Sequence, residues 1–187
     1  GSQGFLCTRY RLLSKPNTDA LLMKHVTIIA VPKALGSTIT IPLEMLSAAN
    51  DIAKSRRQLD KLVAIDLASG TDTTELELSG GLRLKCQTTL DRISKSDLIF
   101  VPGIWGNPRA SLPKLKPMMK WLVEQYAAGS TLCSPVTGSF FLAEAGLLRG
   151  SPATPTLRFL HAFAHRSPTP KLQRKRFLPV HINLEFP

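Results

Sequence analysis

Residues 131–150, TLCSPVTGSFFLAEAGLLRG, pass abruptly from a strand pattern to a helix pattern. The apolar run Thr131–Cys133 leads through Ser134 and Pro135 to a bend, and apolar side chains follow at helical spacing from Thr137-Gly138 onward. Bends of this kind hold the nucleophile of many α/β enzymes beside the N–H groups of the helix. The bend residue here is Val136, which is neither a nucleophile, a base nor a metal ligand. The sequence therefore predicts a catalytic scaffold without its catalyst.

The rest of the chain alternates strand and helix patterns. Buried strands are predicted at His25–Val31, Lys61–Ser69 and Asp97–Val101, and helices at Pro42–Ser55 and Pro117–Ala128. Such alternation is typical of an α/β fold, in which a mostly parallel sheet has helices on both faces. The helix at 42–55 is expected to bury an apolar stripe made of Leu43, Leu46, Ala49 and Ile52.

A small antiparallel hairpin interrupts this alternation. Polar and apolar residues alternate over 75–78 and again over 82–86, with Gly80-Gly81 at the turn between them. The pattern indicates two strands with one exposed face. Beyond Gly150 the signal weakens, and we expect a short helix at Phe159–Ala164 and a strand or extended tail at Phe177–Phe186.

Length and composition limit the class of protein. The chain has 187 residues, 43% of them hydrophobic, which suits one domain with a sizeable core. No apolar run reaches the roughly 18 residues of a membrane-spanning helix, so no membrane association is expected. We interpret residues 1–24 as a tag remnant with an amino-terminal extension and residues 25–187 as the functional domain. Three scattered cysteines favour a reducing cytoplasm over a disulfide framework or a zinc site.

The net charge of +11 concentrates near the carboxyl end. No acidic residue occurs between Glu144 and Glu185, whereas basic residues recur from Arg149 to Arg176. Such a stretch is either a nucleic-acid footprint or a solvated face. His161 and His165 have a spacing that can hold a metal ion on one helix face, but no Glu or Cys accompanies them, and no metal site is expected.

Three segments resemble a known family. The VPG loop at 101–103, the phrase PLEMLSAAN at 42–50 and the run TGSFFLAEAGLLRG at 137–150 look like the PfpI/ThiJ family of the class I glutamine-amidotransferase-like superfamily. They are most similar to its non-enzymatic branch, the amino-terminal domains of AraC-family transcriptional regulators. The resemblance covers about residues 25–157. It implies a flavodoxin-like sheet, a homodimer, and DNA binding through carboxyl-terminal helix-turn-helix units, which we expect beyond residue 187.

The family's catalytic positions are changed in this chain. Active PfpI-like proteins carry a cysteine at the bend, a glutamate near the end of the first strand, and a histidine downstream. The corresponding residues here are Val136, Thr38 and Thr156, so the resemblance implies that the chain is not an enzyme. The loop at Gly103 and the helix start at Thr137 remain, and in the enzymes these would form the oxyanion hole.

We therefore predict a ligand site at the strand ends, because ligands of parallel sheets bind beyond the carboxyl ends of the strands. Its hydroxyls and main-chain N–H groups suit a small polar metabolite, and no cofactor is expected. The candidate lining residues are Thr38, Gly103, Ile104, Trp105, Ser134, Val136, Thr137 and Thr156.

Three functions compete on the sequence alone. The first is the ligand-sensing and dimerisation domain of an AraC-family regulator. The second is an active thiol hydrolase or glyoxalase that uses Cys133. The third is a free-standing nucleic-acid binder acting through Arg158–Arg176. The aliphatic residue at the bend favours the first.

Overall fold

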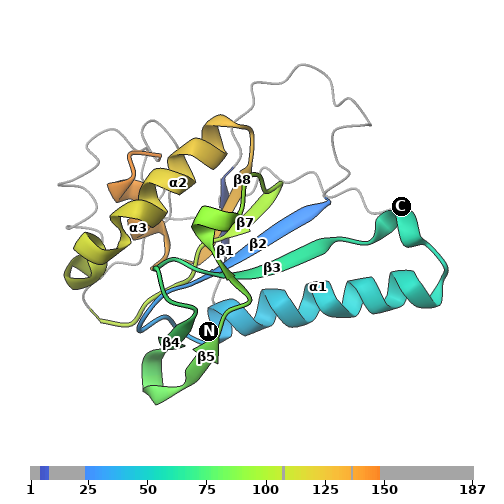
Figure 1. Ribbon diagram of the computed structural model, residues 1–187, viewed down its shortest axis with the longest axis horizontal. Helices are drawn as coiled ribbons and strands as arrows, with labels where there is room; N and C mark the ends of the chain where they lie inside the picture. The colour runs from blue at the N-terminus through green and yellow to red at the C-terminus, as the bar shows by residue number, and fades with distance from the viewer. Residues whose placement is uncertain (1–4, 9–23, 107, 136, 148–187) are drawn as a thin grey trace, which may run out of the picture.

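The computed structural model describes residues 5–8, 24–106, 108–135 and 137–147 (Figure 1). They form three layers, in which a central sheet has helix α1 (Ser37–Ser55) on one face and helices α2 (Lys116–Ala127) and α3 (Ser139–Glu144) on the other. The predicted α/β, flavodoxin-like architecture is confirmed. None of the helices in these ranges is long and apolar enough to cross a membrane.

The sheet has six strands in the order β1-β8-β7-β2-β3-β6. Five of them are parallel: β2 (His25–Ala30), β3 (Ala64–Ser69), β6 (Thr88–Thr89), β7 (Leu98–Phe100) and β8 (Thr131–Pro135). The chain winds outward from β2 through β3 to β6, then returns to the other side of β2 to form β7 and β8. The winding direction thus reverses between β2 and β7, the kind of position where α/β sheets bind ligands.

Strand β2 lies at the centre of the sheet and is packed on both faces. Its apolar residues Val26, Ile28 and Ile29 are completely buried, which explains the continuous apolar pattern of this segment. The three strands predicted at 25–31, 61–69 and 97–101 are confirmed. The second begins only at Ala64, because Leu59–Lys61 form a short 3₁₀ helix, η2.

Strand β1 (Phe5–Thr8) is the one antiparallel strand of the six, and it lies along the outer edge of β8 in the register Leu6↔Ser134. It falls within the stretch interpreted above as a tag remnant and extension. Four residues are too few to show a reliable pattern. The edge position of β1 therefore became apparent only from the structure.

The predicted hairpin is confirmed. Strands β4 (Glu75–Glu77) and β5 (Arg83–Lys85) pair antiparallel in the register Leu76↔Leu84, and both glycines of the turn have a φ of 78°. Leu76 is buried and Leu84 half-buried, whereas the charged residues of both strands are exposed. The hairpin is fixed to the body by main-chain bonds from Lys33 N to Glu77 O and from Ser79 N to Ala34 O, both 2.9 Å.

Helix α1 differs from its prediction in two ways. It begins at Ser37 instead of Pro42, so Pro42 lies inside the helix. It also buries a different face, made of Thr38, Ile39, Pro42 and Ala53, with Leu43 and Leu46 half-buried.

Ala49 and Ile52 of the predicted stripe are exposed. The reason is Asn50, whose side-chain amide donates to Val63 O at 2.8 Å and accepts from Val63 N at 2.9 Å. These two bonds hold the Asn50 side of the helix against the sheet.

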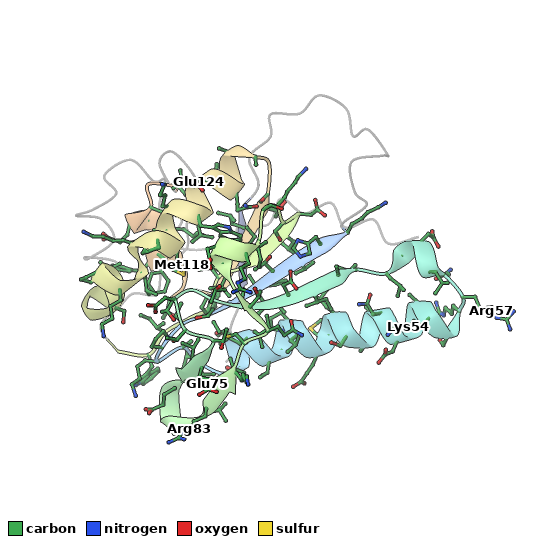
Figure 2. All side chains as sticks on the ribbon, in the orientation of Figure 1. Lys54, Arg57, Glu75, Arg83, Met118 and Glu124 are labelled. Carbon is green, nitrogen blue, oxygen red and sulfur yellow. The ribbon has the colours of Figure 1, made fainter. Side chains whose placement is uncertain are left out.

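The first and last residues of the two remaining helices largely agree with the prediction. Helix α2 stops before Gly129, whose φ of 98° few other residues adopt. On its inner side Trp121 is buried and donates to Ile93 O at 3.0 Å, and Figure 2 labels Met118 on the same helix. Helix α3 begins after Gly138 as predicted but ends at Glu144, since Gly146 has a φ of 76°. The elements predicted at 159–164 and 177–186 lie outside the described residues.

Candidate functional site

The predicted site residues meet where the loops after β2 and β7 approach the end of β8. Gly103 lies at the centre of this junction. A Cβ placed on Gly103 would lie 2.6 Å from Thr137 Oγ1, 3.1 Å from Pro135 Cγ and 3.3 Å from Thr38 Cγ2. The structure therefore brings Thr38, Gly103 and Thr137 together, and a side chain at Gly103 would require the Thr137 side chain to move.

Thr38 lies in the first turn of α1 and is bonded to both adjoining loops. Its hydroxyl donates to Leu35 O at 2.7 Å and accepts from Gly103 N at 3.1 Å, while Leu35 N donates to Gly103 O at 2.8 Å. The Gly103 N–H, which the resemblance assigned to an oxyanion hole, is thus occupied by a side chain of the same molecule. The early start of α1, which fixes Thr38 in place, was missed from the sequence, although Gly36-Ser37-Thr38 is a helix-start pattern.

The beginning of α3 also packs directly on other parts of the main chain. Gly138 N donates to Pro135 O at 2.9 Å. A Cβ on Gly138 would lie only 2.7 Å from Pro102 O and 3.0 Å from Val101 O. The glycine is required because the helix start rests directly on the main chain of the loop after β7.

Ile104 and Trp105 have opposite environments. Ile104 is buried and forms an isolated β-bridge with Ala34. Trp105 is 69% exposed, so in this structure it does not wall the junction as the pocket prediction would require.

Ser134 faces away from the junction. Side chains alternate along a strand, so Ser134 shares a face with Leu132, and the register Ile99↔Leu132 and Thr27↔Ile99 extends that face across the sheet. Ile29 of β2 and Val31, just past its end, lie on the same face. This face packs against α2, because a Cβ placed on Gly70 would contact Ile29, Val31 and also Met118 of α2. Ser134 therefore lies on the α2 side, whereas Pro135 lies on the α1 side with Thr38. The hydroxyl of Ser134 is completely buried, with no hydrogen-bond partner among the described residues.

Two predicted site residues, Val136 and Thr156, lie outside the described residues, as do His161, His165 and the basic stretch Arg158–Arg176. Cys133, the nucleophile of the alternative hypothesis, is buried within β8. Reactive thiols require an accessible and charged setting, which a sheet interior does not provide.

Among its described residues the junction carries no ionisable side chain, and its hydroxyl and main-chain groups donate and accept hydrogen bonds. Cys86 lies elsewhere, beside the hairpin, where burial raises the pKa of its thiol to about 11. Within the described ranges, no cluster of three or more His, Cys, Asp or Glu side chains could hold a metal ion.

Comparison with solved structures defines the class of fold. The chain superimposes on an AraC-family transcriptional regulator from Pseudomonas putida with a TM-score of 0.66 at 19% identity, over 83% of this chain and 81% of that one. It superimposes equally well on DJ-1beta of Drosophila melanogaster, with a TM-score of 0.66 at 16% identity, over 82% and 75% of the two chains. The chain therefore has the fold that these two structures share, one a transcriptional regulator and the other a DJ-1 protein.

Two further matches are to transcriptional regulators. A proposed transcriptional regulator from Vibrio parahaemolyticus superimposes with a TM-score of 0.70 at 23% identity, over 82% of this chain and 78% of that one. In sequence, the chain is 34% identical over 99 residues to the HTH-type transcriptional regulator CdhR of Pseudomonas aeruginosa, a match that covers 53% of this chain and 29% of CdhR. No protein-family profile matches the sequence. The resemblance to PfpI-like domains of AraC-family regulators is confirmed.

Proposed function

We propose that this chain is the non-catalytic, ligand-sensing and dimerisation domain of an AraC-family transcriptional regulator in the cytoplasm. DNA would be bound by helix-turn-helix units in a part of the protein that this sequence does not include. The similarity to CdhR supports the regulator class. The aliphatic Val136 at the bend supports the lack of catalysis.

The observation that carries the proposal is the hydrogen bond between Gly103 N and Thr38 Oγ1. A ligand carboxylate or carbonyl oxygen that accepts from Gly103 N–H would displace the Thr38 hydroxyl. Because Thr38 belongs to the first turn of α1, this exchange would couple ligand binding to the position of that helix. We propose the junction, including Val136 and Thr156, as the sensing site for a small polar metabolite.

Helix α1 is suited to transmit such a shift because its outer side is apolar. Ile41, Met45 and Ile52 are 45%, 67% and 52% exposed, and their spacing places them on one side of the helix. Ala48 and Ala49 are exposed between them. We propose that a second copy of the chain packs on this side, so that a movement of α1 alters the geometry of a homodimer.

Two measurements test this function. Calorimetry with a panel of small metabolites should detect at least one ligand whose affinity changes in Thr38→Val. The absence of any binding heat or thermal shift would contradict the sensing role. Sedimentation should show a dimer that Met45→Lys disrupts. Ser47→Lys is the matched control, because Ser47 is exposed on the same helix two residues away, on a different side.

Thiol labelling separates this function from the enzymatic alternative. We expect Cys133 to react with iodoacetamide only when the protein unfolds. Rapid stoichiometric labelling of the folded protein at Cys133, with a hydrolase activity that Cys133→Ser abolishes, would show that the protein is an enzyme and contradict the proposed receptor function.

A further inference from the structure

A polar depression lies beside the hairpin, away from the strand-end junction. It has a volume of about 620 Å³, and its walls come from the loop after β3, the ends of β4 and β5, strand β6 and the short 3₁₀ helix η4 (Leu90–Arg92) that follows. Strands β3 and β6 are parallel in the register Ser69↔Thr89, so the depression is at their carboxyl ends. Figure 2 labels Glu75 and Arg83 on the hairpin; Glu75 borders the depression and Arg83 does not.

Two acidic and two basic side chains line this depression: Asp72, Glu75, Lys85 and Arg92. Within the described part of the chain, none of the four forms an ion pair. Glu75 and Lys85 do not pair even though they are directly opposite in the hairpin register. The neighbouring Glu77 behaves differently, since its carboxylate pairs with Lys33. Four charges of both signs are therefore available around one concave surface.

The walls of the depression are held by hydrogen bonds to the body of the domain. The Ser69 hydroxyl accepts from Thr71 N at 3.1 Å and lies 2.9 Å from Thr71 Oγ1. On the opposite wall, Gln87 N donates to Leu67 O at 2.9 Å, and Leu67 N donates to Gln87 Oε1 at 3.0 Å. The loop and the hairpin meet through Cys86 N and Thr74 O at 2.8 Å. These bonds order the backbone from which the four exposed, charged side chains extend, and a backbone ordered before a ligand arrives lowers the entropic cost of binding.

We propose that this depression binds a small zwitterion, with the ligand carboxylate at Lys85 and Arg92 and its ammonium group at Asp72 and Glu75. The charge balance carries the assignment. The whole chain has a net charge of +11 and attracts anions in general, whereas these four side chains sum to zero and match a ligand that carries both signs. Hydroxyls such as that of Thr73 add neutral hydrogen-bonding groups to the same surface. The site is separate from the Thr38–Gly103 junction and does not depend on the function proposed there.

The test is two-dimensional NMR of the full chain with the free proteinogenic L-amino acids as probes. We expect at least one probe to shift the backbone signals of Thr73 and Gln87. The N-acetyl and carboxamide derivatives of that probe each lack one charge, and we expect them to bind about tenfold more weakly or worse.

Variants assign the charges to the two ends of the ligand. Lys85→Gln removes a partner of the ligand carboxylate and should weaken binding of the zwitterionic probe about tenfold. Glu75→Gln removes a partner of the ligand ammonium group and should weaken binding of the same probe to a similar extent. Arg83→Gln is the matched control, because it removes the same charge from the same strand outside the depression, and it should leave the affinity unchanged. Circular dichroism checks that each variant is folded.

Three results would overturn the proposal: no probe shifts these signals, the shifts persist unchanged in Lys85→Gln and Glu75→Gln, or the shifts appear only around Thr38 and Gly103. Because the measurement needs neither DNA nor a dimer, failure of the regulator function would not affect its outcome.

Discussion

The side-chain oxygen of Thr38 accepts a hydrogen bond from the backbone N–H of Gly103 at 3.1 Å, and this bond joins α1 to the loop after β7. Both groups are buried, so neither can exchange its partner for water without a local opening. In a catalytic PfpI-like site the first position would carry a carboxylate. In this chain the Thr38 hydroxyl is neutral, and it bonds to both adjoining loops through Leu35 O and Gly103 N.

Removal of this hydroxyl should destabilise the domain. Thr38→Val keeps the shape of the side chain but leaves Gly103 N without its partner and removes one of the two hydrogen bonds to Leu35 O, which still accepts from Thr38 N; we expect a cost of about 1–3 kcal/mol in the free energy of unfolding. Thr38→Ser keeps the hydroxyl and should retain most of the stability. Urea denaturation of the two variants measures the difference, and equal losses would show that the hydrogen bonds contribute little.

Gly138 should be more sensitive to an added methyl group than Gly103. A Cβ at Gly138 meets main-chain atoms of Val101 and Pro102 at 2.7–3.2 Å, and main chain cannot rotate away. At Gly103 the shortest contact is the Thr137 side chain, which can change rotamer.

We expect Gly138→Ala to lower the free energy of unfolding by about 1–3 kcal/mol, and Gly103→Ala to have a smaller effect. Gly36→Ala is the control, since its Cβ would make only ordinary contacts from 3.4 Å. Thermal unfolding ranks the three, and a Gly103→Ala variant less stable than Gly138→Ala would contradict the geometric argument.

The sequence predicted the elements whose pattern is set locally. Strand β2 is a continuous apolar run because it is buried on both faces, and the hairpin alternates because Leu76, Leu78, Leu84 and Cys86 face inward while the charged residues between them are exposed. Helix α2 ends where Gly129 adopts a left-handed conformation. Each of these signals is contained within a few consecutive residues.

Features that depend on distant partners were not predictable in this way. The buried side of α1 is decided by Asn50 and its two bonds to Val63, which no periodicity of α1 alone reveals. The charged depression brings Asp72 of the loop after β3 together with Arg92 of η4. At the junction, the convergence of Thr38, Gly103 and Thr137 followed from strand order, but the Thr38–Gly103 hydrogen bond required coordinates.

Cys86 should make the domain less stable at alkaline pH. Burial raises the pKa of this thiol from 9.0 to about 11, so the unfolded chain loses the proton first as the pH rises. The contribution of the buried thiol is therefore complete below pH 9.0 and decreases from there toward about 11. Urea denaturation across this range should show a smaller decrease in Cys86→Ala than in the parent protein, and parallel decreases would contradict the assignment.

Asp97 should make the opposite contribution at acid pH. Partial burial acts to raise the pKa of its carboxyl group, but hydrogen bonds from the backbone N–H groups of Lys24 and His25, both 2.9 Å, together with the charges of Lys95 and His25, outweigh burial and hold the pKa below 3.8. An acid whose pKa is lower in the folded state stabilises that state above the unfolded pKa, and the contribution is lost as the pH falls through the folded value.

We therefore expect Asp97→Asn to cost about 1 kcal/mol at neutral pH and progressively less as the pH falls below 3.8. Asp51→Asn is the matched control: the side chain of Asp51 is 75% exposed and pairs, among the described residues, with Lys54 one helical turn away, so its replacement should have little effect at either pH. Denaturation of the three proteins at neutral and acid pH measures both effects. A loss in Asp97→Asn that stays constant with pH would show that the side chain acts through packing instead of charge.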